Sequence, residues 1–205
     1  MLIKRLRFII FYLGAGKSSL FKGLFRFLDR SHVNGEILID DIDISRLPLD
    51  YLRSHLCVIP QQPILFNDTL RYNLDPLNHY SDEQCLMALD DVQLRQFVSK
   101  HSAGLLMSIA ESGSNLSAGE CQLICIARAI LKKSKILLID EATANIDENT
   151  EKVIQAIIAD KFQDRTILTI AHRLNTVAKS DRILILDKGE IIKFDTPANI
   201  LHYYQ

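Results

Sequence analysis

Apolar residues follow two alternating patterns along the chain. Short continuous apolar runs indicate buried parallel strands, which are covered on both faces of a sheet. Longer stretches with an apolar residue every three or four positions indicate helices that bury one face. The expected strands are Phe8–Leu13, Glu36–Ile39, Leu56–Ile59, Lys135–Asp140, Thr166–Ile170 and Arg182–Leu186. The expected helices are Ser18–Leu28, Asp82–Leu89, Ala118–Lys132, Glu148–Phe162 and Arg173–Lys179.

This alternation predicts an α/β fold with a mostly parallel sheet flanked by helices. The stretch from Thr69 to Lys100 has no good strand, so we expect a helical subdomain over about residues 69–133, inserted in a single domain of residues 1–205. Asp187-Lys188-Gly189 predicts a hairpin turn into a further strand, Glu190–Phe194.

Composition excludes several classes of protein for this chain. The chain is 48% hydrophobic, and 24 basic residues nearly balance 25 acidic ones, so we expect no nucleic-acid partner and no disorder. The four cysteines have neither CxxC nor zinc-ligand spacing, and Cys121 and Cys125 should simply pack on one helix face. No uncharged stretch approaches the roughly 20 apolar residues of a membrane-spanning helix.

The first residues allow two interpretations. Basic Met1–Arg7, apolar Phe8–Leu13 and small Gly14–Gly16 have the outline of a secretory signal. The apolar run is only six residues long, however, and the small residues continue directly into Lys17-Ser18. We therefore favour a buried strand that leads into a phosphate-binding loop.

Phosphate binding is the chemistry that this loop suggests. In Gly14-Ala15-Gly16-Lys17-Ser18-Ser19, glycines would let backbone N–H groups close around phosphate oxygens, and the following helix N-terminus adds positive charge. Lys17 would reach the terminal phosphates and Ser18 would bind Mg²⁺. Phe11 replaces the first glycine of the full motif, so a glycine-rich turn without a ligand is the alternative for this segment alone.

A second element strengthens this interpretation. The apolar strand Ile136–Ile139 ends in Asp140 and Glu141. Because ligands collect at the carboxyl ends of strands in open α/β sheets, Asp140 should lie beside the phosphate loop and hold Mg²⁺. Glu141 could take a proton from a water that attacks the γ-phosphate. Alone, a strand ending in Asp-Glu is often just a solvated strand end.

Leu116-Ser117-Ala118-Gly119-Glu120 opens the longest predicted helix. Ser117 and Glu120 have the spacing of a capping box, so an ordinary helix start is the plain explanation. The pattern Leu-Ser-x-Gly, about 20 residues before the Asp-Glu strand, nevertheless resembles the signature motif of ATP-binding cassette (ABC) ATPases.

Other marks of that family follow in order. Gln61 resembles its Q-loop glutamine, Ala144-Asn-Ile-Asp147 its D-loop, and His172 its switch histidine. The segments most similar to the second nucleotide-binding domain of the multidrug-resistance-associated (C) subfamily are Asn73–Pro76, Ala110–Leu116 and Glu141–Asp147.

The resemblance implies a P-loop NTPase with ATP and Mg²⁺ as cofactors. It also implies that two such domains sandwich ATP between them and power export through membrane-spanning domains. It places the chain at the cytoplasmic face of a membrane. Residues of one site would be Gly14, Ala15, Gly16, Lys17, Ser18 and Ser19 for nucleotide binding, Ser18, Gln61 and Asp140 for Mg²⁺, and Glu141, His172 and Gln61 for catalysis. Residues facing the nucleotide held by a partner domain with a consensus signature would be Leu116, Ser117, Ala118, Gly119 and Glu120, with Asp147 in the D-loop.

Three departures from the family bear on activity. Ala118 and Glu120 replace consensus signature residues, and a carboxylate at Glu120 should disfavour nearby phosphates. Only thirteen residues precede Gly14, so we expect the family's N-terminal antiparallel β subdomain to be largely missing. With Phe11 in the loop, we expect weakened nucleotide binding by the isolated chain.

Three functions follow. We expect an ATP-hydrolysing motor domain of an export transporter, an ATPase coupled to transmembrane transport. The alternatives are a nucleotide-sensing regulatory module, against which Glu141 and His172 argue, and a truncated cassette that has lost nucleotide binding, for which Phe11 argues. A soluble DNA-repair cassette is weaker, because the coiled coils of such proteins are absent.

Overall fold

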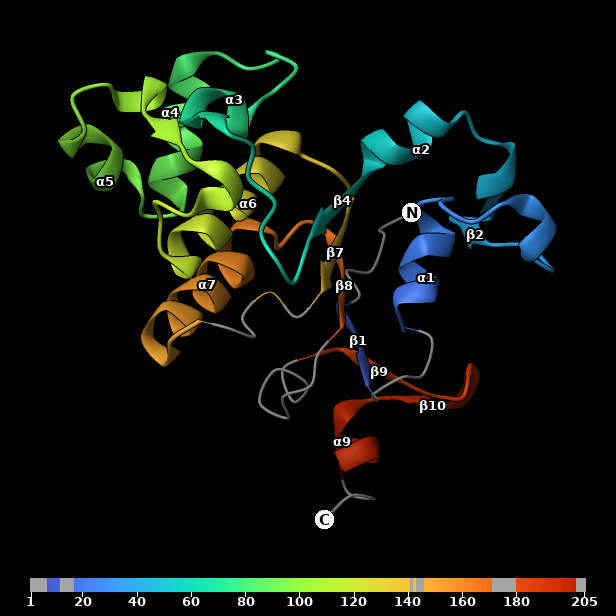
Figure 1. Ribbon diagram of the computed structural model, residues 1–205. Helices are drawn as coiled ribbons and strands as arrows, with labels where there is room; N and C mark the ends of the chain where they lie inside the picture. The colour runs from blue at the N-terminus through green and yellow to red at the C-terminus, as the bar shows by residue number, and fades with distance from the viewer. Residues whose placement is uncertain (1–6, 12–16, 141, 143–145, 171–179, 202–205) are drawn as a thin grey trace. The chain divides into compact units, whose positions relative to one another are not determined.

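The computed structural model describes residues 7–11, 17–140, 142, 146–170 and 180–201 (Figure 1). The chain forms two compact units. The first unit contains Met1–Cys57, Ser134–Asp140 and Arg165–Gln205, and the second contains Val58–Lys133 and Glu141–Asp164. The expected alternation of strands and helices is confirmed across the described residues.

A six-stranded sheet has the strand order β10-β9-β1-β8-β7-β4. Strand β1 pairs in parallel with both β8 and β9, β7 pairs in parallel with β8, and β10 pairs antiparallel with β9. The mostly parallel sheet is therefore confirmed. The strands are β1 (Arg7–Phe11), β4 (Leu56–Ile59), β7 (Ile136–Asp140), β8 (Thr166–Ile170), β9 (Arg182–Asp187) and β10 (Glu190–Asp195).

Helices of the first unit pack an apolar core against the sheet. Phe21 and Phe25 lie in one buried cluster with Leu52, Leu138 and Ile170. This cluster covers the face of β7 that carries Leu138. The helices of this unit are α1 (Lys17–Leu24), α2 (Leu49–His55) and α9 (Pro197–Leu201), with short 3-10 turns at Arg30–His32 and Ile44–Arg46.

Helix α1 is shorter than the predicted Ser18–Leu28, because the chain turns after Leu24. Arg26 has a positive φ of 51°, and its guanidinium donates hydrogen bonds to the carbonyls of Ile44 (3.2 Å) and Leu47 (2.6 Å). These partners lie far along the chain, so the local pattern of apolar residues gives no sign of them. Helix α2 was not predicted, since seven residues are too few to establish helical periodicity.

Two tight turns close the hairpins of the first unit. The predicted turn before Glu190 is confirmed: Lys188 (φ 49°) and Gly189 (φ 85°) both adopt left-handed conformations, as a type I′ hairpin requires. Asp40 and Asp41 do the same between β2 (Leu38–Ile39) and β3 (Ile42–Asp43). The first strand of this pair is two residues shorter than the predicted Glu36–Ile39.

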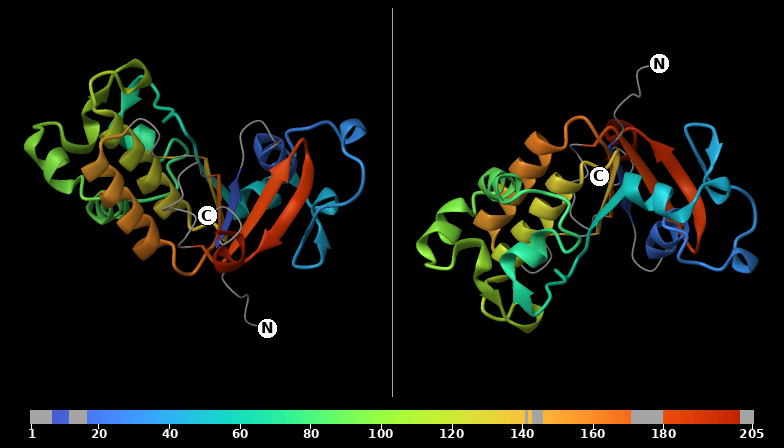
Figure 2. Two further views of the ribbon diagram at one scale, coloured as in Figure 1. Left: turned by 90° about the horizontal axis from the view of Figure 1, so that it is seen from below. Right: turned by 90° about the horizontal axis from the view of Figure 1, so that it is seen from above.

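The second unit is mainly helical, with α6 packed between neighbouring helices (Figure 2). Its helices are α3 (Leu70–Leu74), α4 (Asp82–Asp91), α5 (Arg95–Lys100), α6 (Ala118–Lys132) and α7 (Glu148–Lys161), with 3-10 turns at Gly104–Leu106 and Glu111–Gly113. As expected, residues 70–100 form helices and no strand. The two-residue strand β5 (Asp68–Thr69) precedes them and pairs antiparallel with β6 (Ser108–Ile109). Cys121 and Cys125 are buried on α6, as predicted.

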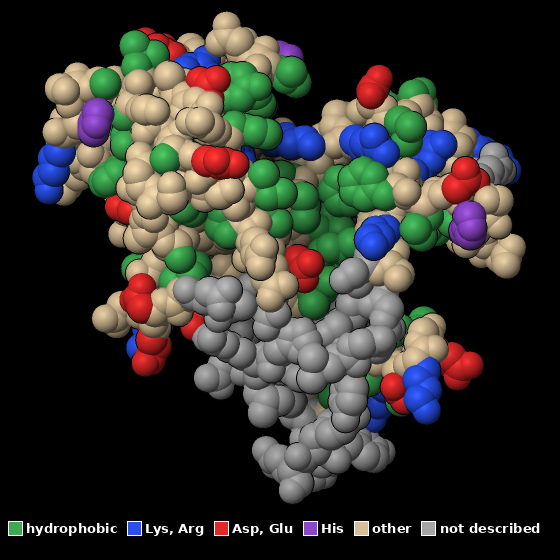
Figure 3. Space-filling view, in the orientation of Figure 1, with side chains coloured by type: hydrophobic (Ala, Val, Ile, Leu, Met, Phe, Trp, Pro, Cys, Tyr) green, Lys and Arg blue, Asp and Glu red, His purple; other side chains and the backbone are tan. Residues whose placement is uncertain are grey.

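Apolar side chains also reach the surface of the second unit (Figure 3). Ile64, Leu77 and Leu106 are each more than 60% exposed, and Phe66 is 49% exposed. Within the described parts of the chain, no helix combines the length and apolar character needed to cross a membrane.

Candidate nucleotide-binding site

The carboxyl ends of β1, β8 and β7 lie in register at one edge of the sheet. Ile10 of β1 lies opposite Ile170 of β8, and Ile170 lies opposite Asp140 of β7. Adjacent strands are about 4.8 Å apart, so Asp140 ends its strand about 10 Å from the end of β1. Residues 12–16 join that end of β1 to the first turn of α1 at Lys17. The half-buried Asp140 carboxylate thus shares an edge with the strand-to-helix connection.

Several predicted site residues lie outside the described part of the chain. These are Gly14, Ala15, Gly16, Glu141 and His172, as is the predicted helix Arg173–Lys179. The backbone of Lys17 and Ser18 opens α1, but the positions of their side chains are also outside the description. Ser19, in the same helical turn, is exposed. The roles assigned to these residues stay predictions.

Oxygen ligands suit Mg²⁺, and the candidate ligands fit this preference. Asp140 offers a carboxylate at the sheet edge, Ser18 a hydroxyl residue at the start of α1, and Gln61 an amide oxygen in an exposed bend of the second unit. Among the residues whose positions are described, no group of three or more His, Cys, Asp or Glu side chains is arranged to hold a metal by itself. Each of the three candidate residues therefore offers the oxygen donor that Mg²⁺ prefers.

The signature residues form the N-terminus of α6. Ser117 is the N-cap: its hydroxyl accepts the Glu120 backbone N–H (3.2 Å) and donates to Glu120 Oε2 (2.8 Å). The same carboxylate oxygen accepts the Ser117 backbone N–H at 2.8 Å, which completes the predicted capping box. Ala118 is exposed, whereas Leu116 is half-buried. The proton of the Ser117 hydroxyl is therefore engaged by Glu120.

Within the second unit, Thr150 links the signature residue Gly119 to the D-loop residue Asp147, two motifs that were predicted separately. Asp147 caps α7 and accepts the Thr150 backbone N–H at 3.0 Å. This backbone bond, with a side-chain hydrogen bond to Thr150, lowers the pKa of the exposed Asp147 carboxyl. Thr150 in turn packs on Gly119, where a Cβ would come within 2.7 Å of Thr150 Cγ2. Only a residue without a side chain fits Gly119 at this distance.

The segment that carries Gln61 is held by α6. Gln122 Nε2 donates to the Pro60 carbonyl at 3.2 Å, and Arg128 Nη1 donates to the Ile64 carbonyl at 2.6 Å. Gln122 is completely buried. Neither residue was predicted as part of the site, although both are polar interruptions in the apolar run Cys121–Leu131.

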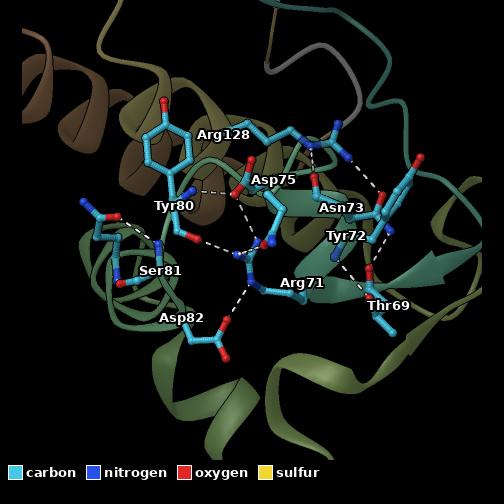
Figure 4. Close-up of polar contacts among 11 residues, drawn as sticks. Thr69, Arg71, Tyr72, Asn73, Asp75, Tyr80, Ser81, Asp82 and Arg128 are labelled. Atoms are coloured by element: carbon cyan, nitrogen blue, oxygen red, sulfur yellow. Dashed lines mark hydrogen bonds and ion pairs between the residues drawn. The ribbon is translucent and has the colours of Figure 1, made fainter.

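A buried amide fixes the end of this segment (Figure 4). Asn73 accepts the Phe66 backbone N–H (2.8 Å) and donates to the carbonyls of Phe66 (2.9 Å) and Thr69 (3.0 Å). Arg128 donates to both the side chain and the backbone carbonyl of Asn73. Desolvation of the guanidinium by these neighbours lowers the pKa of Arg128.

An ion-pair cluster centred on Arg71 lies next to Asn73 in the chain. Arg71 Nε contacts Asp82 at 2.7 Å and Nη1 contacts Asp75 at 3.3 Å. Burial by itself would raise the pKa of Asp75, but backbone N–H groups of Tyr80 and His79, together with Arg71, reverse the effect and lower it. The sequence Asn73-Leu-Asp-Pro76, singled out above for its resemblance, thus contains two buried polar residues with defined partners.

A mostly parallel sheet, in which β1 is followed by α1 and an acidic strand end lies at the carboxyl edge, is typical of the P-loop class of α/β proteins. Within that class, residues 12–144 match the family described as "ABC transporter", and this chain belongs to that family.

The chain's relatives are of the C subfamily. It is 51% identical over 188 residues to "ATP-binding cassette sub-family C member 3" of Mus musculus and 47% identical over 188 residues to "Probable multidrug resistance-associated protein lethal(2)03659" of Drosophila melanogaster. These alignments cover 92% of this chain but only 12% and 14% of the relatives. The chain therefore spans a small part of the length of the curated relatives that it matches.

Solved structures agree with this assignment. The structure of a bacterial Atm1-family ABC exporter with ATP bound has a TM-score of 0.88 and 36% sequence identity to this chain. The alignment covers 98% of this chain and 35% of the exporter chain. The predicted α/β P-loop fold and the family resemblance are both confirmed.

Proposed function

We propose that the chain binds and hydrolyses ATP as one half of an ATP-sandwich dimer that powers transmembrane export. The observation that carries the proposal is the register Ile10–Ile170–Asp140, which aligns an acidic strand end with the strand that leads into the phosphate loop. Membership in the ABC transporter family supports ATP as the nucleotide.

Each predicted residue has a role in this proposal. Lys17 binds the terminal phosphates, and Ser18, Gln61 and Asp140 hold Mg²⁺, which neutralises charge on the β- and γ-phosphates when bound. Glu141 takes the proton of the attacking water, and His172 stabilises the transferred phosphoryl group. The phosphate groups are favoured further by the N-terminus of α1.

The signature turn serves the nucleotide of a partner domain in this proposal. The exposed N-terminus of α6, with Ser117, Ala118 and Gly119, faces that nucleotide. Glu120 weakens the contact, because its carboxylate engages the Ser117 hydroxyl and repels phosphate. Efficient hydrolysis at this chain's own phosphate loop then depends on a consensus signature in the partner.

The exposed apolar side chains of the second unit support a protein partner. Ile64, Phe66 and Leu77 are between 49% and 72% exposed and lie within 14 residues of one another in the chain. Exposed apolar surface is typical of sites where proteins interact. We propose that the membrane-spanning domains of an exporter cover them, which places the chain at the cytoplasmic face of a membrane.

The decisive experiment is calorimetric titration of the chain with Mg-ATP beside a Lys17→Ala variant. Binding that is lost in the variant supports a working phosphate loop despite Phe11. Turnover abolished by Glu141→Gln then supports the motor. Binding without such turnover supports the nucleotide-sensing module, and absence of binding in both proteins supports the truncated cassette.

A further inference from the structure

The segment Pro60–Phe66 is joined to the signature region at three places, all inside the second unit. Gln122 Nε2 donates to the Pro60 carbonyl, and Arg128 Nη1 donates to the Ile64 carbonyl. Leu65 packs against Gly113, where an added Cβ would come within 2.8 Å of Leu65 Cδ1. Residues immediately before and after the signature therefore contact the segment that carries Gln61.

The contact made by Gln122 determines how its amide is oriented. The Pro60 carbonyl only accepts hydrogen bonds, so the donor nitrogen of Gln122 must face it. Gln122 Oε1 is buried and, within the described structure, accepts no hydrogen bond. The unpaired Oε1 is unfavourable and offsets part of the stabilisation that the Nε2 bond to Pro60 provides, so the net contribution of this glutamine to folding stability is small.

Pro60 lies directly before Gln61, so the hydrogen bond from Gln122 to the Pro60 carbonyl also affects the position of Gln61. Prolines at positions 60 and 63 fix φ at both ends of the exposed pair Gln61-Gln62. A change in the position of the Pro60 carbonyl is therefore passed on to Gln61. Gln122 itself lies five residues after Ser117, about 7.5 Å along the axis of α6.

We propose that Gln122 is a positioning residue that fixes Gln61 relative to the signature turn. The inference rests on the proposed function, in which Gln61 serves this chain's nucleotide and Ser117 serves that of the partner. Helix α6 joins the two, because it carries Ser117 at its N-cap and Gln122 five residues later.

The contact can be tested without nucleotide by spin-label mobility. All four native cysteines are buried, so Gln62→Cys offers an exposed thiol for selective labelling. In this background, Gln122→Met should make the label more mobile, because methionine preserves length but cannot donate to Pro60. The matched control is Gln155→Met on α7, whose glutamine donates to Glu151 in its own helix. Equal mobility in the two variants would overturn the proposal.

A conservative variant separates the hydrogen bond from packing. Gln122→Glu keeps the shape of the side chain, and its buried carboxylic acid has an O–H donor when protonated. The label should therefore be restrained at low pH and become mobile as the pH rises, with no such change in the glutamine protein. Mobility that does not depend on pH in Gln122→Glu would show that the amide acts only as a space-filling group.

Turnover supplies the second test. Gln122→Met should lower kcat for ATP about ten- to hundred-fold, the size of effect expected for a misplaced site residue, with little change in the affinity for Mg-ATP or in Tm. In a Gln61→Ala background the same change should have no further effect on kcat, whereas independent losses would contradict positioning through Gln61. These assays include a partner domain with a consensus signature. If the parent chain lacks turnover even with that partner, the proposed hydrolytic function fails, while label mobility still decides whether Gln122 holds Pro60.

Discussion

The Ser117 hydroxyl donates its proton to the Glu120 carboxylate at 2.8 Å, across the first turn of α6. In a signature that stabilises phosphate, this proton would be available to the nucleotide. The carboxylate also accepts the Ser117 backbone N–H, so two donors of the turn are directed toward a negative charge of the chain itself. The helix gains a cap from this arrangement, and under the proposed function that cap would weaken phosphate binding at the signature.

Replacing Glu120 with glutamine should strengthen ATP-dependent association with a consensus partner domain by about 1 kcal/mol, because a negative charge beside phosphates is removed. Sedimentation equilibrium at low and high salt provides the measurement, and the gain should shrink at high salt, where screening is stronger. Glu111→Gln, an exposed carboxylate in the preceding 3-10 turn, is the control and should change little. A gain shared by both variants would contradict a specific effect of Glu120.

Gly119→Ala should destabilise the chain by about 1–3 kcal/mol, because the new methyl group overlaps Thr150 Cγ2. Thr150→Ser removes that methyl group and should recover most of the loss in the double variant. Gly23→Ala is the matched control: its nearest neighbour, Ile37 Cδ1, would lie at an ordinary 3.5 Å, and alanine favours the helix. Urea unfolding measures all four proteins, and equal effects at Gly119 and Gly23 would rule out close packing as the cause.

Arg128→Met should lower the free energy of unfolding by about 2–4 kcal/mol, because the carbonyls of Asn73 and Ile64 lose their buried donor. Arg128→Lys should recover only part of this, since an ammonium cannot reproduce the planar set of donors. Arg95→Met on the exposed side of α5 is the comparison. Similar unfolding midpoints for the Arg128 and Arg95 methionine variants would contradict the assigned role.

Asp75 should make stability depend on pH in acid. Its pKa is lower in the folded chain than in the unfolded chain, so it stabilises the fold above about pH 4, near the unfolded value, and this contribution is lost as the pH falls through the lower folded pKa. Asp75→Asn should be less stable at pH 7 and lose less stability on acidification. The measurement is urea unfolding from pH 7 to 2.5; parallel pH curves for the two proteins would contradict it.

Local sequence signals determine some elements almost completely. Helix α6 has its predicted bounds, because the Ser117–Glu120 capping box marks its start and its apolar run is long. Strands β4 and β8 also have their predicted bounds, since short apolar runs flanked by polar residues leave little choice of register. The alignment of Asp140 with the end of β1 followed from the general behaviour of parallel sheets.

The parts that sequence reasoning missed depend on distant contacts. Gln122 and Pro60 are 62 positions apart, and Arg128 and Asn73 are 55 apart. A polar residue inside an apolar helix indicates that its side chain needs a hydrogen-bond partner, but the sequence pattern does not identify the carbonyl group that serves as that partner. The early end of α1 has the same origin, since the partners of Arg26 lie 18 and 21 positions further on.

The position of β1 has a consequence for synthesis on the ribosome. Of the six strands of this sheet, β1 is synthesised first, yet it lies between β8 and β9, with Ile10 and its partner Ile170 separated by 160 positions. At 5–20 residues per second, the apolar segment Phe8–Phe11 waits roughly 10–30 s for its neighbours. Both of its edges are unpaired during that time, which makes it a site for aggregation or chaperone binding. The sheet can close around β1 only once β9, which ends at Asp187, has been translated.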